Sequence, residues 1–447
     1  MGNYIIREAQ IVNEGRINTT DMLVEDGRIA GIGTHIERKG AYQEIDARGL
    51  YLMPGLIDDQ VHFREPGLTH KACIASEARA AVAGGVTSFM EMPNVVPPTL
   101  NLERLEEKFS IAANTSLANH SFFLGVSNEN TTDALQINKH KRNICGLKIF
   151  MGSSTGNMLV DNIVTLENVF AESEVLIATH CEKEGIIKEN LANLQQQQVD
   201  INHARFHPII RDVEACYESS LGAIQLAKKH NTRLHILHIS TAKELDLFTN
   251  LFPLQDKRIT AEVCVHHLHF TADDYARYGN LIKCNPAIKA PEHKEALWKA
   301  LLDDRLDIIA TDHAPHTWDE KQKPYVESPS GLPLVQHSLQ MLLEAYHAGR
   351  ISLEKIVEKA CHAPAICFDV AERGYIREGY FADFVLVDLT KKYTVSKDNI
   401  LYQCAWSPLE GHTFSSSIEK TFVNGHLVFD GGQQVSDQKG LRLTFDR

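Results

Sequence analysis

The sequence predicts an α/β protein with a central (β/α)8 barrel and a small β-sandwich built from both chain ends. Short apolar runs alternate with helical stretches in the central part, whereas both ends show short alternating strands separated by turns. The length of 447 residues suits a barrel of roughly 250 to 400 residues plus an accessory unit. We place the boundaries at residues 1–53, 54–370 and 371–447. An open doubly wound sheet is the alternative for the central part.

The sandwich is predicted from two groups of strands. Near the beginning, residues 4–12, 21–24 and 28–32 have strand character, and residues 25–27 between the last two form a turn. Near the end, residues 383–388, 421–423 and 426–429 also have strand character, and Asn424-Gly425 between the last two forms a hairpin turn. We therefore expect the two ends to complete one unit, with the barrel inserted between them.

The barrel is predicted from eight apolar runs, at residues 56–62, 86–92, 121–125, 144–151, 175–180, 233–239, 259–266 and 307–312. Helices are expected between several of them, at residues 70–83, 212–230, 290–303 and 334–348. Eight strand-then-helix units are the number that a closed barrel needs, and the chemistry of such barrels lies at the C-terminal ends of the strands.

The composition excludes several classes of partner. A formal net charge of -13 argues against a nucleic acid or an anionic membrane as the main partner, but it allows a small anionic substrate if cations are gathered locally. The nine cysteines are scattered without a Cys-x-x-Cys pair, which predicts reduced thiols in the cytoplasm. No apolar run approaches the roughly 18 residues that a membrane span needs.

Polar residues close several of the apolar runs. His62 ends the first run, His180 the fifth and Asp312 the eighth, and His238 lies near the end of the sixth. One histidine at a strand end is usually hydrogen-bonded structure, but these four would meet at the barrel mouth. Together they predict a metal site.

The segment Asp58-Asp59-Gln60-Val61-His62 carries an unusual residue for such a site. Alternation along a strand directs Asp58, Gln60 and His62 to one face. Two histidines so spaced could hold one ion, but the glutamine offers only a neutral amide oxygen, a poorer ligand for a zinc-like ion. Gln60 therefore indicates that the first metal position is weakened or no longer catalytic.

Lys148 interrupts the apolar run at residues 144–151. An unpaired ammonium would be costly to bury and would repel a metal ion. Carbamylation by carbon dioxide would turn the side chain into a carboxylate that is long enough to bridge two ions. A salt bridge with a carboxylate such as Asp312 is the alternative.

These residues lie in motifs that resemble the dihydroorotases of the amidohydrolase superfamily, over nearly the whole chain. The motifs are Pro54-Gly55-Leu56-Ile57-Asp58, His62-Phe63-Arg64-Glu65-Pro66-Gly67, Met92-Pro93-Asn94, Gly146-Leu147-Lys148, His238-Ile239-Ser240-Thr241, His266-His267-Leu268, Asn285-Pro286 and Thr311-Asp312-His313-Ala314-Pro315-His316. Each motif is weak alone, but their order and spacing are specific.

The resemblance implies a zinc centre with one or two ions. His62 and Asp312 would hold the first ion, His180 and His238 the second, and carbamylated Lys148 would bridge them. Gln60 stands where the family normally has a histidine ligand of the first ion. Asp312 would be the catalytic residue that carries a proton from the nucleophile to the departing ring nitrogen. The reaction implied is the reversible cyclisation of N-carbamoyl-L-aspartate to dihydroorotate in pyrimidine (UMP) biosynthesis, in a homodimer.

A carboxylate on the substrate would be bound by Arg64 and Asn94, since a guanidinium is suited to bidentate binding of a carboxylate. A structural salt bridge from Arg64 to Glu65 is the alternative. By resemblance, the rest of the substrate pocket would come from Asn285, His316 and the backbone of Ser330 and Gly331. We assign no role to His266, His267, His269 and His313.

Three other functions remain open. Hydantoinases and dihydropyrimidinases share the metal set and the barrel, but they carry a tyrosine shortly after the bridging lysine, where this chain reads Phe150-Met151-Gly152-Ser153-Ser154. Allantoinases lack the Phe63-Arg64-Glu65-Pro66 arrangement. A non-catalytic scaffold subunit would explain Gln60, but such proteins typically lose several ligands together with the lysine.

Overall fold

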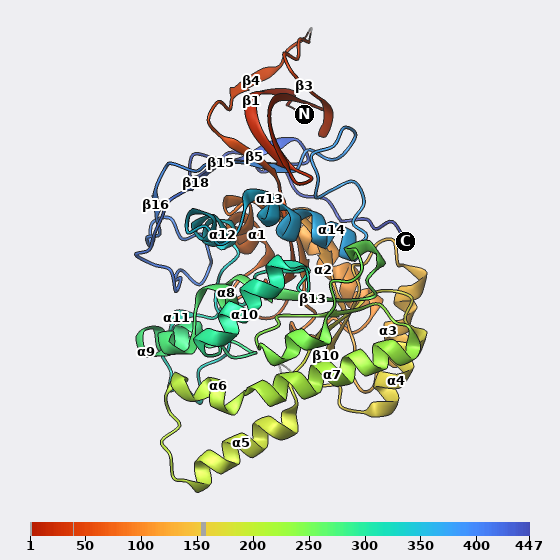
Figure 1. The fold of residues 1–447 in the computed structure, drawn as a ribbon. Coiled ribbons are helices and arrows are strands. Elements are labelled where there is room, and N and C mark those ends of the chain that lie inside the picture. Colours follow the sequence, from red (N-terminus) through yellow and green to blue (C-terminus); the bar gives the residue numbers. More distant parts are fainter. Residues whose placement is uncertain (1, 39, 153–157) are drawn as a thin grey trace.

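The computed structural model describes residues 2–38, 40–152 and 158–447 (Figure 1). Ser153 and Ser154, part of the segment compared with hydantoinases, lie outside these residues. In Figure 1 a barrel surrounded by helices lies beneath a sheet formed by both chain ends.

The predicted barrel is confirmed, and each of the eight apolar runs overlaps one of its strands, although the third strand begins at Asn119, two residues before its run. The strands are β6 (Leu56–Val61), β7 (Val86–Glu91), β8 (Asn119–Phe122) continued by β9 (Leu124–Gly125), β10 (Leu147–Phe150), β11 (Ile177–His180), β12 (Leu234–Ile236), β13 (Ile259–Cys264) and β14 (Ile308–Ala310). Neighbouring strands pair in parallel in chain order. Closure occurs between β14 and β6, where the His62 backbone N–H donates to the His313 carbonyl at 2.7 Å.

The four predicted helices are α1 (Ile74–Ala83), α7 (Val213–His230), α10 (Pro291–Leu302) and α12 (Ser338–His347). Helix α7 illustrates how the sequence sets its own limits. Asp212 caps its beginning by accepting a hydrogen bond from the Ala215 backbone, and Asn231 ends it in the left-handed conformation at φ 55°. The other helices are α2 (Leu102–Thr115), α3 (Thr131–Leu135), α4 (Ile163–Glu172), α5 (Glu184–Gln196), α6 (His207–Ile210), α8 (Val265–His269), α9 (Tyr275–Tyr278), α11 (Trp318–Lys321), α13 (Leu353–Val357) and α14 (Ala363–Phe368).

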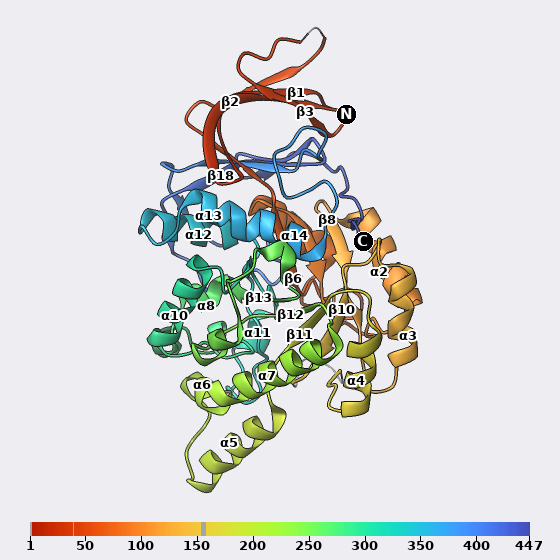
Figure 2. The same ribbon diagram turned by 45° about the vertical axis from the view of Figure 1, so that its right-hand side comes forward.

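Strands from both ends of the chain form one continuous sheet, in the order β20-β19-β18-β15-β5-β1-β2-β3, with β4 paired to β1. The strands are β1 (Tyr4–Asn13), β2 (Arg16–Glu25), β3 (Arg28–Gly33), β4 (Gln43–Asp46), β5 (Tyr51–Pro54), β15 (Phe384–Asp388), β18 (Ser417–Val423), β19 (His426–Asp430) and β20 (Gln433–Gln434), while β16 (Tyr393–Thr394) pairs with β17 (Thr413–Phe414). The two ends join where Met53 of β5 faces Val385 of β15. Figure 2 shows the sheet curling over itself, so that apolar residues such as Ile6, Val24 and Phe384 pack inside it.

The last residues of the chain differ from the predicted organisation, which assigns residues 371–447 to the sandwich. They return to the barrel, where His120 pairs with Arg442 and Val370 with Phe445. Leu443 and Phe445 are buried there in an apolar cluster with Phe123 and Phe368. This segment therefore covers barrel residues at the end opposite the candidate site.

Two further features concern the chemical setting. None of the described helices combines the length and the hydropathy that crossing a membrane requires. All nine cysteines are described, and each is a free thiol.

Candidate active site

A cavity of about 270 Å³ lies at the C-terminal ends of the barrel strands. It is lined by every residue predicted for the site except His316: Gln60, His62, Arg64, Asn94, Lys148, His180, His238, Asn285, Asp312, Ser330 and Gly331. Phe150, Arg211, Ala314 and Pro329 complete the lining. The predicted residues therefore come together, although they lie far apart in the sequence.

Strand β6 does not follow the simple alternation expected for Asp58, Gln60 and His62. A bulge between Asp58 and Val61 inserts one extra residue opposite β7. Asp58 consequently points away from the cavity and accepts a hydrogen bond from the Thr311 hydroxyl at 2.5 Å. Burial raises the pKa of Asp58 to about 7. Gln60 and His62 share one direction, as predicted, but Asp58 does not.

Gln60 and His62 converge on one oxygen of Asp312. The His62 Nε2 atom lies 3.1 Å from Asp312 Oδ1, and the Gln60 amide nitrogen donates to the same oxygen at 3.2 Å. The side-chain amide oxygen of Gln60, Oε1, instead accepts a hydrogen bond from the Cys264 thiol at 3.6 Å. Gln60 is therefore oriented as a hydrogen-bond donor to Asp312.

His62 has the orientation of a metal-binding histidine. Its Nδ1 atom lies 2.8 Å from Asn94 Oδ1, so an N–H at Nδ1 leaves the Nε2 lone pair directed at Asp312. Burial lowers the pKa of His62, which favours the neutral ring. A lone pair and a carboxylate oxygen at this distance are compatible when a cation or a proton lies between them.

His180 and His238 form the other half of the predicted centre. His180 Nδ1 lies 2.9 Å from His238 Nε2, and no described residue is a hydrogen-bonding partner of His238 Nδ1. Burial lowers the pKa of both rings and keeps them in the neutral form that metals bind. Behind them Glu182 is ion-paired with Arg211 and lies 3.1 Å from His180 Nε2.

Lys148 is 1% exposed, and its amine has no hydrogen bond or ion pair with any described residue. The amine lies over the Phe150 ring, 4.5 Å from the ring centre. Burial lowers the pKa of Lys148 to about 7, so a large fraction of the amine is neutral at physiological pH. The alternative salt bridge to Asp312 is not formed.

The donor set fits a zinc-type centre. Buried imidazoles, a carboxylate and a partnerless lysine amine face one cavity. Imidazole and carboxylate are ligands that zinc prefers. Within this set, Lys148 Nζ and His238 Nδ1 have no hydrogen-bonding partner among the described residues, and a carbamate and an ion would supply one.

Arg64 is 2% exposed, lines the cavity and forms no ion pair with any described residue. It donates from Nε to the Pro315 carbonyl at 3.0 Å, and its Nη2 atom lies 3.1 Å from His316 Nε2. Glu65, the partner in the alternative reading, instead accepts a hydrogen bond from the Ile74 backbone at the start of α1. Burial lowers the pKa of Arg64 to about 10, which still leaves it charged. The cavity thus contains a charged guanidinium that is ion-paired with none of the described carboxylates.

His316 differs from the other predicted substrate-binding residues because it does not line the cavity. It lies behind Arg64, and its ring also lies 3.0 Å from both the Ser330 carbonyl and the Lys71 amine. These contacts fix the position of Arg64. Asn285 lies 3.0 Å from His207 Nε2 and faces the cavity directly.

The loop carrying Ser330 and Gly331 is held by two buried lysines. Lys321 donates to the carbonyls of Pro329 and Gly331, and Lys283 donates to that of Ser328. Gly331 has a φ of 139°, and a Cβ atom there would lie 2.4 Å from the Ala314 carbonyl oxygen. This position therefore requires glycine, and its backbone can approach a bound ligand closely.

The histidines without an assigned role fall into different settings. His313 is structural, because it lies 2.8 Å from Glu77 of α1 and accepts from the Leu334 backbone at 3.0 Å. His269 packs against the Phe270 ring. His266 and His267 lie with Cys264 in a separate buried group.

Arg211 was missed by the sequence analysis. It lies between α6 and α7, so the rule that selects strand ends could not find it. Glu182 could have been found, since it follows His180 by two positions at the end of β11.

Comparisons with known proteins agree with this geometry. A model of the amidohydrolase family matches residues 51–428. A dihydroorotase of Halobacterium salinarum is 32% identical over 96% of each chain, and an allantoinase of Solibacter usitatus is 31% identical over 96% of this chain and 94% of its own. The structure of an L-hydantoinase (dihydropyrimidinase) from Arthrobacter aurescens aligns with a TM-score of 0.93 and 26% identity, covering 99% of this chain and 100% of that one. The resemblance to dihydroorotases is confirmed, and the chain belongs to the amidohydrolase family and is a hydrolase.

Proposed function

We propose that this amidohydrolase is a dihydroorotase, which interconverts N-carbamoyl-L-aspartate and dihydroorotate with loss or uptake of one water molecule. The observation that carries the proposal is Arg64, a buried and charged guanidinium that faces the cavity without an ion pair among the described residues. A buried charge of this kind calls for an anionic partner. Dihydroorotate carries a ring carboxylate, whereas hydantoin and allantoin do not.

The metal assignment is part of the proposal. His62 and Asp312 would hold one zinc ion, His180 and His238 a second, and Lys148 would bridge them as a carbamate. The lowered pKa of Lys148 supports this, since carbon dioxide adds to a neutral amine: an N–C bond forms, a proton leaves and a carboxylate results. Zinc bound there would activate a water molecule and polarise the amide carbonyl that it attacks.

Substrate binding and proton transfer would be carried out by side chains of the protein. Arg64 binds the ring carboxylate, with the amide of Asn94 beside it, and His316 holds Arg64 in place. Asn285 and the backbone of Ser330 and Gly331 contact the ring on its other side. Asp312 takes the proton from the attacking water and returns it to the departing ring nitrogen.

The biological setting is proposed on the same grounds. A dihydroorotase would act in pyrimidine biosynthesis, in the cytoplasm, where nine free thiols remain reduced. We further propose a homodimer.

Substrate comparison with the purified, zinc-loaded protein tests the proposal. Ring opening of dihydroorotate should have a kcat/KM at least about 100-fold above those of hydantoin and allantoin. This factor is the expected contribution of the two hydrogen bonds from Arg64 to a carboxylate, which hydantoin and allantoin lack. Faster turnover of allantoin would assign the chain to the function of its Solibacter relative. No turnover together with less than one equivalent of tightly bound zinc would indicate a scaffold subunit.

A further inference from the structure

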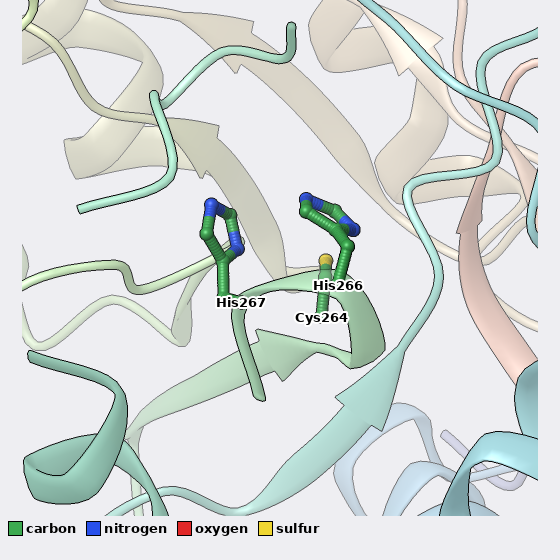
Figure 3. A group of neighbouring side chains, drawn as sticks. All are labelled: Cys264, His266 and His267. Atoms are coloured by element: carbon green, nitrogen blue, oxygen red, sulfur yellow. The ribbon is translucent and has the colours of Figure 1, made fainter. Parts of the chain in front are cut away.

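A second group of ligand-type side chains lies just beyond the cavity lining. Cys264 ends β13, and His266 and His267 follow in the short helix α8. One ligand atom from each lies within 4.8 Å of the other two, and all three residues are buried. Figure 3 shows the Cys264 sulfur beneath the His266 ring, with the His267 ring beside them.

The two imidazoles lack partners that buried polar groups normally have. Neither ring nitrogen of His266 has a hydrogen-bonding partner among the described residues, although the Thr311 carbonyl lies near the ring. His266 is 0% exposed, so bulk water does not reach it. Leaving such nitrogens unpaired costs about 1–3 kcal/mol each, which a bound ion would offset.

His267 has the arrangement of a metal ligand. Its Nε2 atom lies 3.2 Å from the Pro286 carbonyl, which can accept the ring N–H. This contact fixes the tautomer and leaves Nδ1 as a bare lone pair, and Nδ1 has no described partner. Metal-bound histidines almost always donate their other ring N–H to such a group.

The group borders the proposed zinc centre but shares no ligand with it. Gln60 separates the two: its amide oxygen accepts from Cys264, while its amide nitrogen donates to Asp312. Gln60 also lines the cavity, so it lies between the cavity and Cys264.

We propose that Cys264, His266 and His267 bind a divalent ion of the zinc class, separate from the ions held by His62, Asp312, His180 and His238. One thiolate and two imidazoles are a zinc-type set, and the fourth position faces Gln60. Ligands of tetrahedral zinc lie about 3.3–3.8 Å apart, so small side-chain rotations close the group around the ion. Binding replaces the thiol proton, which is released to solvent.

Cobalt substitution of the full-length protein tests this site independently of catalysis. Cobalt(II) bound to a thiolate gives a sulfur-to-cobalt absorption band in the near ultraviolet. After removal of metal with a chelator and reloading with cobalt, the native chain should show this band. Cys264→Ser should lose it, whereas Cys361→Ser should keep it, because Cys361 is equally buried but contacts the Pro54 carbonyl instead of histidines.

Zinc content provides the second measurement. Cys264→Ser and His266→Asn should each bind one equivalent fewer than the native chain. His62→Asn should retain the cobalt–sulfur band, because His62 belongs to the other centre. A native chain without the band, a band that persists in Cys264→Ser, or a band lost in His62→Asn would overturn the separate site. Loss of dihydroorotate turnover alone would bear on the proposed function and not on this one.

Discussion

Replacing Arg64 by methionine should abolish most of the preference for a carboxylated substrate. A guanidinium that binds a carboxylate through two charge-assisted hydrogen bonds contributes about 1.5–3 kcal/mol per bond. For two bonds, the lower end of this range gives about 3 kcal/mol, which corresponds to a loss of about 10²- to 10³-fold in kcat/KM for dihydroorotate. Hydantoin, which has no carboxylate, should lose less than about fivefold, and Arg64→Lys should fall between native and methionine because lysine keeps the charge without the fork.

The stability of the same variant separates binding from a structural role. Arg64 has no ion pair with any described residue, so Arg64→Met removes a buried charge without leaving another one unpaired. We expect its unfolding free energy to change by no more than about 2 kcal/mol, mainly for the lost hydrogen bond to Pro315.

Arg211 is the matched control, because it lines the same cavity but pairs with the fully buried Glu182. Arg211→Met should cost about 3–5 kcal/mol in urea unfolding, since it leaves the buried Glu182 carboxylate without its guanidinium partner. Equal losses of activity on dihydroorotate and hydantoin in Arg64→Met, or a destabilisation as large as that of Arg211→Met, would refute the carboxylate-binding role.

Three further substitutions test the centre and the fold. Lys148→Ala should lose bound zinc and activity, with partial rescue by short carboxylic acids, and undiminished turnover would rule out the bridge. Gln60→His should raise zinc occupancy of the first position, because imidazole is the better ligand; unchanged metal content would mean that residue 60 does not face that ion. Burial lowers the pKa of His120 to about 4. As pH falls below about 6.5, His120 becomes protonated in the unfolded chain but stays neutral in the folded protein. The free energy of unfolding should therefore decrease by about 2–3 kcal/mol between neutral pH and pH 4.5. His120→Phe should lack this part of the pH dependence of urea unfolding, and identical pH profiles would contradict it.

The barrel was predictable because its strands are short apolar runs that end in polar residues. The run at 175–180, for example, contains β11 (Ile177–His180), and its last residue lines the cavity. Chemistry at the ends of parallel strands follows from the fold itself. For that reason His62, His180, His238 and Asp312 could be brought together without a structure.

Other features depend on tertiary contacts that no local pattern reveals. The bulge in β6 redirects Asp58 toward Thr311, which strand alternation cannot foresee. Arg211 reaches the cavity from a segment between helices, and His316 acts through Arg64. The amide orientation of Gln60 depends on Cys264, more than 200 positions away in the chain.

The pairing of β5 with β15 also governs the order of events during synthesis. Met53 has no partner on that side until Val385 has left the ribosome, by which time all of the barrel strands have been made. The edge of β5 therefore stays open while the barrel folds, and closing it requires a contact of very large sequence separation, which is slow. An open strand edge is also a template for pairing with other chains. Premature termination before residue 384 would leave that edge permanently exposed, so full-length synthesis protects this protein from aggregation as well as completing its fold.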